Sequence, residues 1–169
     1  MAAGCLRKDI QERLQSQGKK YIIFIDCIKA FDTVNKRKLI GKLESLIGFL
    51  DMTNLVINIL ASNQVQISDG ISQSGWIDQT IGVLQGDPLS PLPFSVLTQD
   101  VSAKIKEGAK NLNLYIYSDD MAIAADNISD MQKGMDVNTQ WADDKELKIN
   151  LKTTELMVFR KGGRLPKED

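Results

Sequence analysis

The sequence predicts an α+β fold, in which an antiparallel sheet carries helices packed on one face. The first sign is residues 115–125, where two apolar, β-prone arms flank Ser118-Asp119-Asp120 without a spacer, the pattern of a tight hairpin. The second is the almost continuous apolar run 21–25, which is typical of a central strand covered on both faces. Helical periodicity fills the segments between and after these strands. The resulting order of elements is mixed, and it favours an α+β domain.

Each element has its own local signal. Apolar residues recur at helical spacing over residues 6–17, and Gly18 ends that helix. Asn35 is placed to cap a helix that extends to residue 47. The other expected elements are a helix at 52–61, strands at 64–68 and 76–81, a loop at 82–88, a helix at 89–107, a helix at 129–145, and strands at 147–150 and 155–159.

Length and composition predict one domain over residues 1–161, followed by a polar tail over 162–169. No apolar run approaches the roughly 20 residues that span a bilayer, and the start lacks a signal-peptide pattern. Cys5 and Cys27 do not make a disulfide framework, so we expect free thiols and an intracellular location, nuclear or cytoplasmic. The chain has no histidine, which excludes Ser-His-Asp triads and zinc–histidine sites.

The net charge of −1 conceals an uneven distribution of charge. Residues 1–50 hold ten Lys and Arg against five Asp and Glu, whereas residues 51–110 hold three against six. The basic cluster at Lys36, Arg37, Lys38 and Lys42 reads first as a solvated helix face. A nucleic-acid contact is the second interpretation of the same cluster.

The paired acids of the hairpin carry the chemical signal. Adjacent carboxylates repel one another, so each raises the free energy of ionising its neighbour. Asp119 and Asp120 on stiff strands therefore make physical sense if a divalent cation binds them, although a solvated turn is the alternative. Asp26 ends the apolar strand at 21–25 and can lie beside the hairpin tip. Three carboxylates on neighbouring strands would hold two hard cations, which is the arrangement used in phosphoryl transfer.

Four segments stand out along the chain: residues 24–32, 85–91, 117–120, and 147–150 together with Thr154 and 157–159. In this order they resemble four successive motifs of reverse transcriptases, and they resemble those of the non-LTR (LINE-like) retrotransposon enzymes most. The resemblance covers about residues 6–160 and implies a polymerase-palm-like antiparallel sheet.

The resemblance also assigns roles to individual residues. It implies that Asp26 and Asp119 bind two Mg²⁺ (or Mn²⁺) ions, that Asp120 completes the acidic cluster, and that the Cys27 carbonyl adds a metal ligand. These are the expected catalytic and metal-binding positions. The implied reaction is attack of a primer 3′-hydroxyl on a dNTP, with RNA as the template.

The expected substrate-binding positions are Phe31, Gln85 and Gly86. Phe31 matches the gate that rejects a ribose 2′-hydroxyl, and Gln85 with Gly86 matches a loop that supports template and nucleotide. From the residues alone, a phenylalanine such as Phe31 is more often a core residue than a gate, and residues 85–88 are also explained as a turn that leads into a helix. Thr153 departs from the motif, because a lysine commonly stands there.

Two classes of function follow. The first is a reverse-transcriptase palm, expected to be weak or inactive alone because most of the fingers and the thumb are absent from the sequence. The second is a catalytically inactive, domesticated retroelement remnant that acts as a scaffold through self-association or a protein partner. Without the fingers and the thumb, we expect the apolar surface that they would cover to be exposed, and this favours a homo-oligomer.

Overall fold

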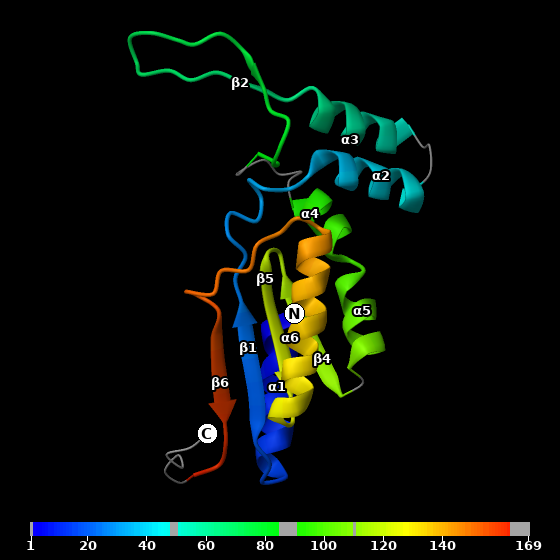
Figure 1. The fold of residues 1–169 in the computed structure, drawn as a ribbon, viewed down its shortest axis with the longest axis vertical. Coiled ribbons are helices and arrows are strands. Elements are labelled where there is room, and N and C mark those ends of the chain that lie inside the picture. The colour runs from blue at the N-terminus through cyan, green and yellow to red at the C-terminus, as the bar shows by residue number, and fades with distance from the viewer. Residues whose placement is uncertain (1, 48–50, 85–90, 110, 163–169) are drawn as a thin grey trace. The chain divides into compact units, whose positions relative to one another are not determined.

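The computed structural model describes residues 2–47, 51–84, 91–109 and 111–162 (Figure 1). In chain order the elements are α1 (Ala2–Gln15), β1 (Lys20–Ile25), α2 (Lys36–Ile47), α3 (Asp51–Ala61), β2 (Gln64–Val65), β3 (Ile77–Asp78), α4 (Pro91–Thr98), α5 (Val101–Gly108), β4 (Leu112–Tyr117), β5 (Asp120–Ala125), α6 (Ile128–Asp144) and β6 (Glu155–Phe159). Within these described ranges, no helix is long and apolar enough to cross a bilayer.

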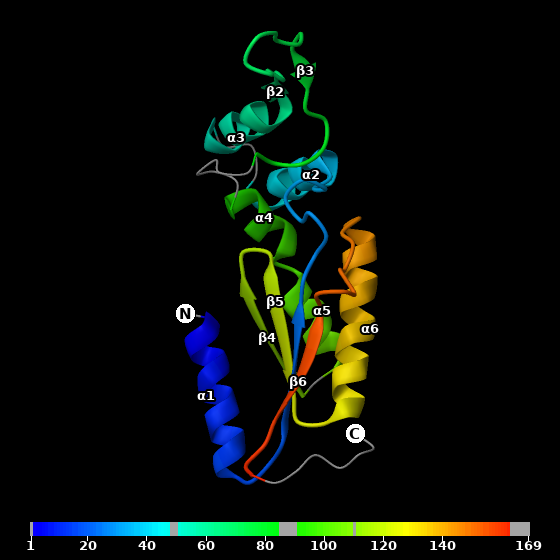
Figure 2. The same ribbon diagram turned by 90° about the vertical axis from the view of Figure 1, so that its left-hand side faces the viewer.

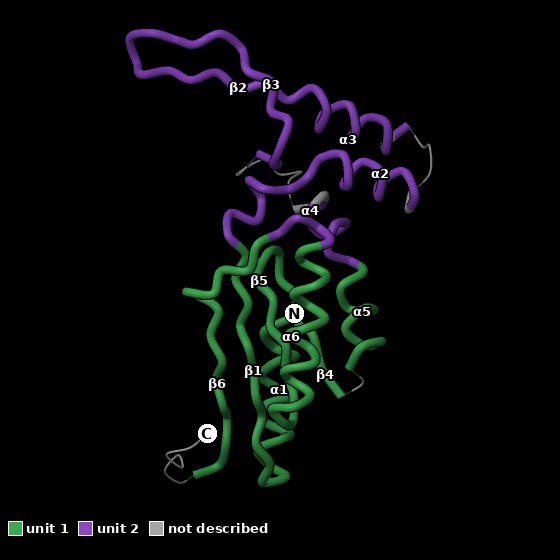
Figure 3. The backbone as a smooth tube through the Cα atoms, viewed as in Figure 1, with its two compact units in different colours: residues 1–27, 100–143, 148–169 green, residues 28–99, 144–147 purple. Residues whose placement is uncertain are grey.

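The chain divides into two compact units, coloured separately in Figure 3. Unit 1 comprises residues 1–27, 100–143 and 148–169, and unit 2 comprises residues 28–99 and 144–147. The single domain over 1–161 stays a prediction, and residues 163–169 of the expected tail lie outside the described residues.

Unit 1 is built on a four-stranded antiparallel sheet in the order β4-β5-β1-β6. The expected α+β class, with an antiparallel sheet, is confirmed. Helices α5 and α6 cover one face, as predicted, while α1 lies on the opposite face (Figure 2). Ile22, Ala122 and Ala124 form the buried floor beneath α1, with Leu6 and Ile10 packed against it.

A close approach on the other face explains one glycine. A Cβ on Gly134 of α6 would lie 2.4 Å from Leu112 Cδ1 and 3.5 Å from Ile123 Cγ2. The helix therefore sits directly on β4 and β5, and a larger side chain at this position would have to displace the end of the Leu112 side chain.

Polar contacts fasten α1 to the sheet. Lys20 is only 6% exposed in its side chain, and its Nζ lies 2.7 Å from Asp9 Oδ1 and 2.9 Å from Asp126 Oδ1. The second oxygen of Asp9 accepts hydrogen bonds from Tyr115 Oη at 2.8 Å and Asn113 Nδ2 at 2.9 Å. One carboxylate of α1 thus contacts β1 and β4 together.

Unit 2 contains the α2–α3 helix pair, α4 and the short β2–β3 ladder. Lys36 was expected on a solvated face but is 6% exposed, because its ammonium donates to the carbonyls of Leu60 at 2.8 Å and Gln79 at 2.5 Å. Burial lowers the pKa of Lys36. The long aliphatic part of the Lys36 side chain lets its ammonium reach backbone carbonyls in two other segments, a contact that a sequence pattern does not reveal.

Most predicted elements occur within a few residues of their expected places, and two segments differ. The expected helix at 89–107 is two helices, α4 and α5. At the break, Asp100 makes no side-chain cap, and its Oδ1 accepts a hydrogen bond from Trp141 Nε1 at 3.0 Å instead. The expected strand at 147–150 is reduced to one bridge between Cys27 and Ile149.

The contacts of Asp9 that hold α1 on the sheet predict that the free energy of unfolding depends on pH. Burial alone would raise the pKa of Asp9, but hydrogen bonds from Lys20, Asn113 and Tyr115 outweigh it and hold the pKa below the usual 3.8. A lowered carboxyl pKa contributes stability above the usual value, and this contribution is lost as pH falls through the folded-state pKa. Asp9→Asn should cost about 1.5–3 kcal/mol at neutral pH and flatten the loss of stability below pH 5, measured by urea unfolding.

Glu12→Gln is the matched control on the same helix, because Glu12 pairs with Lys8 at 3.7 Å on the exposed surface. Such pairs contribute little to stability. Equal pH profiles for wild type and Asp9→Asn would contradict the role given to Asp9.

Candidate functional site

The pairing of β1 with β5 brings two of the predicted carboxylates to one place. Ile25 is opposite Met121 in the antiparallel register. Asp26 follows Ile25, and Asp120 precedes Met121, so the two acids occupy the next positions on adjacent strands. Both have the sheet-face parity of Phe24 and Ala122. They therefore stand on the same face as the apolar floor beneath α1.

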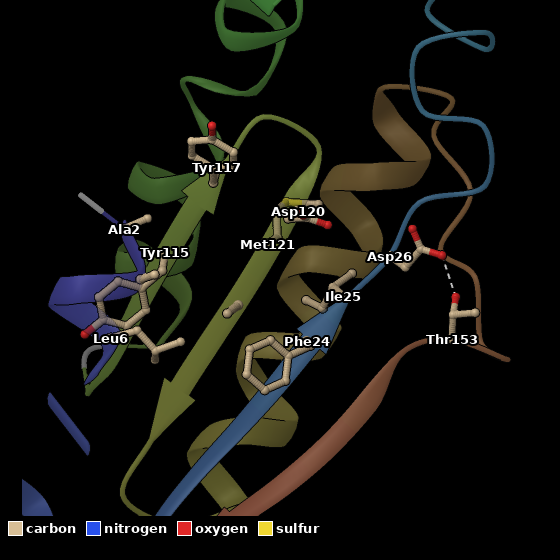
Figure 4. Close-up of a pocket in the computed structure, with 12 residues that line it drawn as sticks. Ala2, Leu6, Phe24, Ile25, Asp26, Tyr115, Tyr117, Asp120, Met121 and Thr153 are labelled. Carbon is tan, nitrogen blue, oxygen red and sulfur yellow. Dashed lines mark hydrogen bonds between the residues drawn. The ribbon is translucent and has the colours of Figure 1, made fainter. Parts of the chain in front are cut away.

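A cavity of about 680 Å³ lies on this face of unit 1 (Figure 4). Its polar lining comes from Asp26, Asp120 and Thr153, and its apolar lining includes Phe24, Tyr115 and Leu6. The two carboxylates thus line one space, at the end of the sheet where β1 finishes and β5 begins.

The third predicted acid lies in the hairpin turn. Tyr117 pairs with Asp120, so Ser118 and Asp119 alone make the connection between β4 and β5. Ser118 has a φ of 58°, in the left-handed region that glycine adopts most easily. This short, constrained turn fixes where the backbone of Asp119 leaves the sheet.

The Cys27 thiol lies within reach of the charges of two predicted acids. Its side chain is buried, and burial, followed by the negative charges of Asp26 and Asp119, raises its pKa to about 11. The thiol is therefore protonated at neutral pH. Charges at both positions act on one sulfur atom, although the two acids are 93 residues apart in sequence (119 − 26).

The segment between α6 and β6 holds Asp26 from its outer side. Asn150 Nδ2 donates to Asp26 Oδ2 at 3.1 Å, and Thr153 Oγ1 donates to the same oxygen at 2.5 Å. Sequence reasoning assigned no role at the site to either residue. The available signal was their position in the fourth motif-like segment, where Thr153 stands in place of the common lysine.

The donor set fits a hard cation only in part. Among the residues that the structure describes, no group of three carboxylates or cysteines converges well enough to hold a metal ion alone. Asp26 and Asp120 nevertheless line the same cavity. One or two carboxylates, completed by water and substrate phosphates, are the usual protein contribution to a Mg²⁺ site. The metal role of the Cys27 carbonyl stays a prediction.

Of the predicted substrate-binding residues, Phe31 belongs to unit 2. Phe31 is partly buried and packs on Phe94 with ring centroids 5.0 Å apart, which is a core contact. Its carbonyl accepts a hydrogen bond from Val83 N at 2.9 Å. Gln85 and Gly86 lie outside the described residues.

Gly82 shows how closely this segment passes the Phe31 loop. Its φ is 81°, and an added Cβ would meet the Asp32 carbonyl oxygen at 2.6 Å. Only glycine combines that backbone conformation with so close an approach. The chain before residue 85 is thus held against residues 31–34.

The raised pKa of Cys27 provides a test of the acidic arrangement. Asp119→Asn removes one of the two negative charges, so the pKa should fall while burial keeps it above the ordinary value of 9.0. The measurement is the pH dependence of iodoacetamide labelling at Cys27 in a Cys5→Ser background. Asp136→Asn, an exposed change on α6, is the control, and an unchanged pKa in Asp119→Asn would contradict the arrangement.

Retrotransposon proteins resemble this chain in sequence. Pol polyproteins of the type-1 retrotransposable element R2 from Nasonia vitripennis and Popillia japonica are each 28% identical over 121 and 123 residues. The matches cover 68% and 67% of this chain, and 12% and 17% of those proteins. The chain thus spans a small part of the length of the curated relatives it matches.

Solved structures show the same fold at low identity. Telomerase from Candida tropicalis, in complex with a fragment of telomeric RNA, has a TM-score of 0.71 at 16% identity. That match covers 93% of this chain and 29% of the telomerase chain. Telomerase from Candida albicans gives a TM-score of 0.59 at 12% identity, over 98% and 31% of the two chains.

The family model for reverse transcriptase (RNA-dependent DNA polymerase) matches residues 3–165. This match spans nearly the whole chain and includes all four motif-like segments. The chain therefore belongs to the reverse transcriptase family, and its retrotransposon relatives place it with the non-LTR type.

Proposed function

We propose that this chain is a reverse-transcriptase palm whose carboxylates Asp26, Asp119 and Asp120 serve RNA-templated DNA synthesis with Mg²⁺ or Mn²⁺. The observation that carries the proposal is the shared cavity of Asp26 and Asp120, which come from sequence-distant segments and stand on adjacent strands. A purely structural role would not require both acids on one face beside an apolar floor. Family membership supports the reaction class.

In this proposal, the carboxylates of the chain would act by binding divalent cations at a fixed position. Two divalent ions, when bound, stabilise the attacking and leaving oxygens of a phosphoryl transfer. Asp26 and Asp119 would bind the ions through their carboxylates, and Asp120 would add negative charge beside them. Because β1 and β5 pair as far as Ile25 and Met121, Asp26 and Asp120 at the next positions would need little reorganisation on binding.

Nucleic acid and a dNTP are the proposed substrates. The matched R2 proteins are retrotransposon polyproteins, and the telomerase neighbour is complexed with telomeric RNA. Phe31, Gln85 and Gly86 remain the proposed substrate contacts. Residues 43–103 contain no Lys or Arg, so this segment offers no cation to a triphosphate. We therefore expect weak synthesis from this polypeptide by itself.

Primer extension on an RNA template tests the polymerase proposal. Wild type with Mg²⁺ or Mn²⁺ should extend a DNA primer slowly, and Asp119→Asn should reduce the rate by at least about a hundredfold, because charge stabilisation in the transition state is lost. In parallel, Mn²⁺ should raise the melting temperature of wild type and not of Asp119→Asn. Absence of any stabilisation by ions, with a higher metal-free melting temperature in Asp119→Asn, would indicate vestigial acids.

One observation favours the second candidate function, a self-associating scaffold. The edge strand β6 exposes Leu156, Met157 and Val158 by 47%, 44% and 37%, and among the described strands it pairs with β1 alone. An apolar strand with an unpaired edge is a template for antiparallel pairing with a second copy of the chain.

Sedimentation velocity tests this candidate. Wild type should form dimers, and Met157→Lys should shift it to monomer, because a charge on an edge strand opposes pairing. Leu151→Lys is the control, since Leu151 is 83% exposed but lies outside the strand. A wild type that is monomeric at all concentrations counts against the scaffold.

A further inference from the structure

Among the described residues, the side-chain donors to Asp26 reach one of its two carboxylate oxygens. Within the described residues, Oδ2 accepts hydrogen bonds from Asn150 Nδ2 and Thr153 Oγ1, and Oδ1 accepts none. Figure 4 shows the Thr153 hydroxyl directed at this carboxylate from the outer side of β1. The same carboxylate lines the cavity that Asp120 shares.

The segment that supplies these donors is itself ordered by Asn150. The carbonyl of Asn150 accepts hydrogen bonds from Thr153 N at 3.2 Å and Thr154 N at 2.9 Å. Its side-chain Oδ1 accepts from Lys152 N at 3.2 Å. The amide is thereby oriented with its NH₂ group toward Asp26, so both ends of the Asn150 side chain are used.

Attachment of this segment to β1 does not need the two carboxylate contacts. Asn150 N donates to the Asp26 carbonyl at 2.8 Å, and Asp26 N donates to Thr154 Oγ1 at 3.3 Å. These bonds to the Asp26 backbone would hold the segment even if the Asp26 side chain were absent. The bonds to Oδ2 therefore act on the orientation of the carboxylate.

We infer that Asn150 and Thr153 are positioning residues, which immobilise Asp26 through Oδ2 so that Oδ1 alone is presented to a divalent cation. The inference rests on the proposed metal function of Asp26. Mg²⁺ requires near-octahedral geometry, which a carboxylate satisfies best with one oxygen. Hydrogen bonds to the far oxygen of a metal ligand typically change metal affinity by 10–100-fold.

Calorimetric titration of the full chain with Mn²⁺ alone tests the inference. Thr153→Val removes the hydroxyl at nearly constant volume, and we expect it to weaken Mn²⁺ binding about tenfold. Thr153→Ser keeps the hydroxyl and should retain wild-type affinity. Asn150→Ser keeps a side-chain acceptor for the turn but loses the amide donor, and it should weaken binding in the same way as Thr153→Val.

Melting temperatures without metal separate positioning from simple stabilisation. A positioning role predicts weaker Mn²⁺ binding in Thr153→Val at an unchanged metal-free melting temperature. Wild-type affinity in Thr153→Val and Asn150→Ser would overturn the inference, whether or not these variants melt earlier.

Two further measurements distinguish failure of the positioning inference from failure of the proposed metal function. They are Mn²⁺ binding by Asp26→Asn and the side-chain amide resonances of Asn150 without metal. If wild type binds Mn²⁺, Asp26→Asn abolishes binding and Thr153→Val does not weaken it, only the inference fails. If wild type does not bind, the metal function fails. In that case the side-chain amide resonances of Asn150 are compared, without metal, between wild type and Asp26→Ala. A difference would show that Asn150 contacts Asp26 in a protein that binds no metal. The contact would then be structural, and the positioning role would be overturned.

Discussion

The antiparallel register of β1 with β5 is the constraint on which the candidate site depends. It fixes Ile25 opposite Met121, and the acids at the next positions become neighbours across the strands. A shift of one residue would move one carboxylate to the opposite face, because side chains alternate along a strand. Burial opposes such a shift, since it would move either Ile22 of β1 or Ala122 and Ala124 of β5 off the floor beneath α1.

The position of α1 links the fold to the site. This helix covers the face that presents Asp26 and Asp120, and its first turns contribute Ala2 and Leu6 to the cavity. Its apolar stripe alone would allow it to slide along the sheet. The Asp9–Lys20 ion pair and the bonds from Tyr115 and Asn113 remove that freedom. A polar cluster therefore fixes the position of α1 on the sheet, and with it the place of Ala2 and Leu6 at the cavity.

The fold imposes different conditions on the carboxylates. Asp26 is restrained by donors from the segment before β6, whereas Asp119 is placed by a two-residue turn in which Ser118 adopts a left-handed backbone. Asp120 is the first residue of β5, so the alternation of side chains along the strand sets the face of the sheet on which it lies. Backbone pairing, turn geometry and side-chain hydrogen bonds thus each place one carboxylate at the same end of the sheet.

The sequence by itself determined the strands, the hairpin and the identity of the acids. Period-two and period-3.6 patterns are local, and Ser118-Asp119-Asp120 leaves a tight turn as the simplest connection. Tertiary structure alone decided which face α1 occupies, the burial of Lys36, the division of the helix at Asp100 and the contacts of Asn150 and Thr153 with Asp26. Each of these depends on donors and acceptors more than 20 residues apart in the chain, and no local periodicity records which of them will meet.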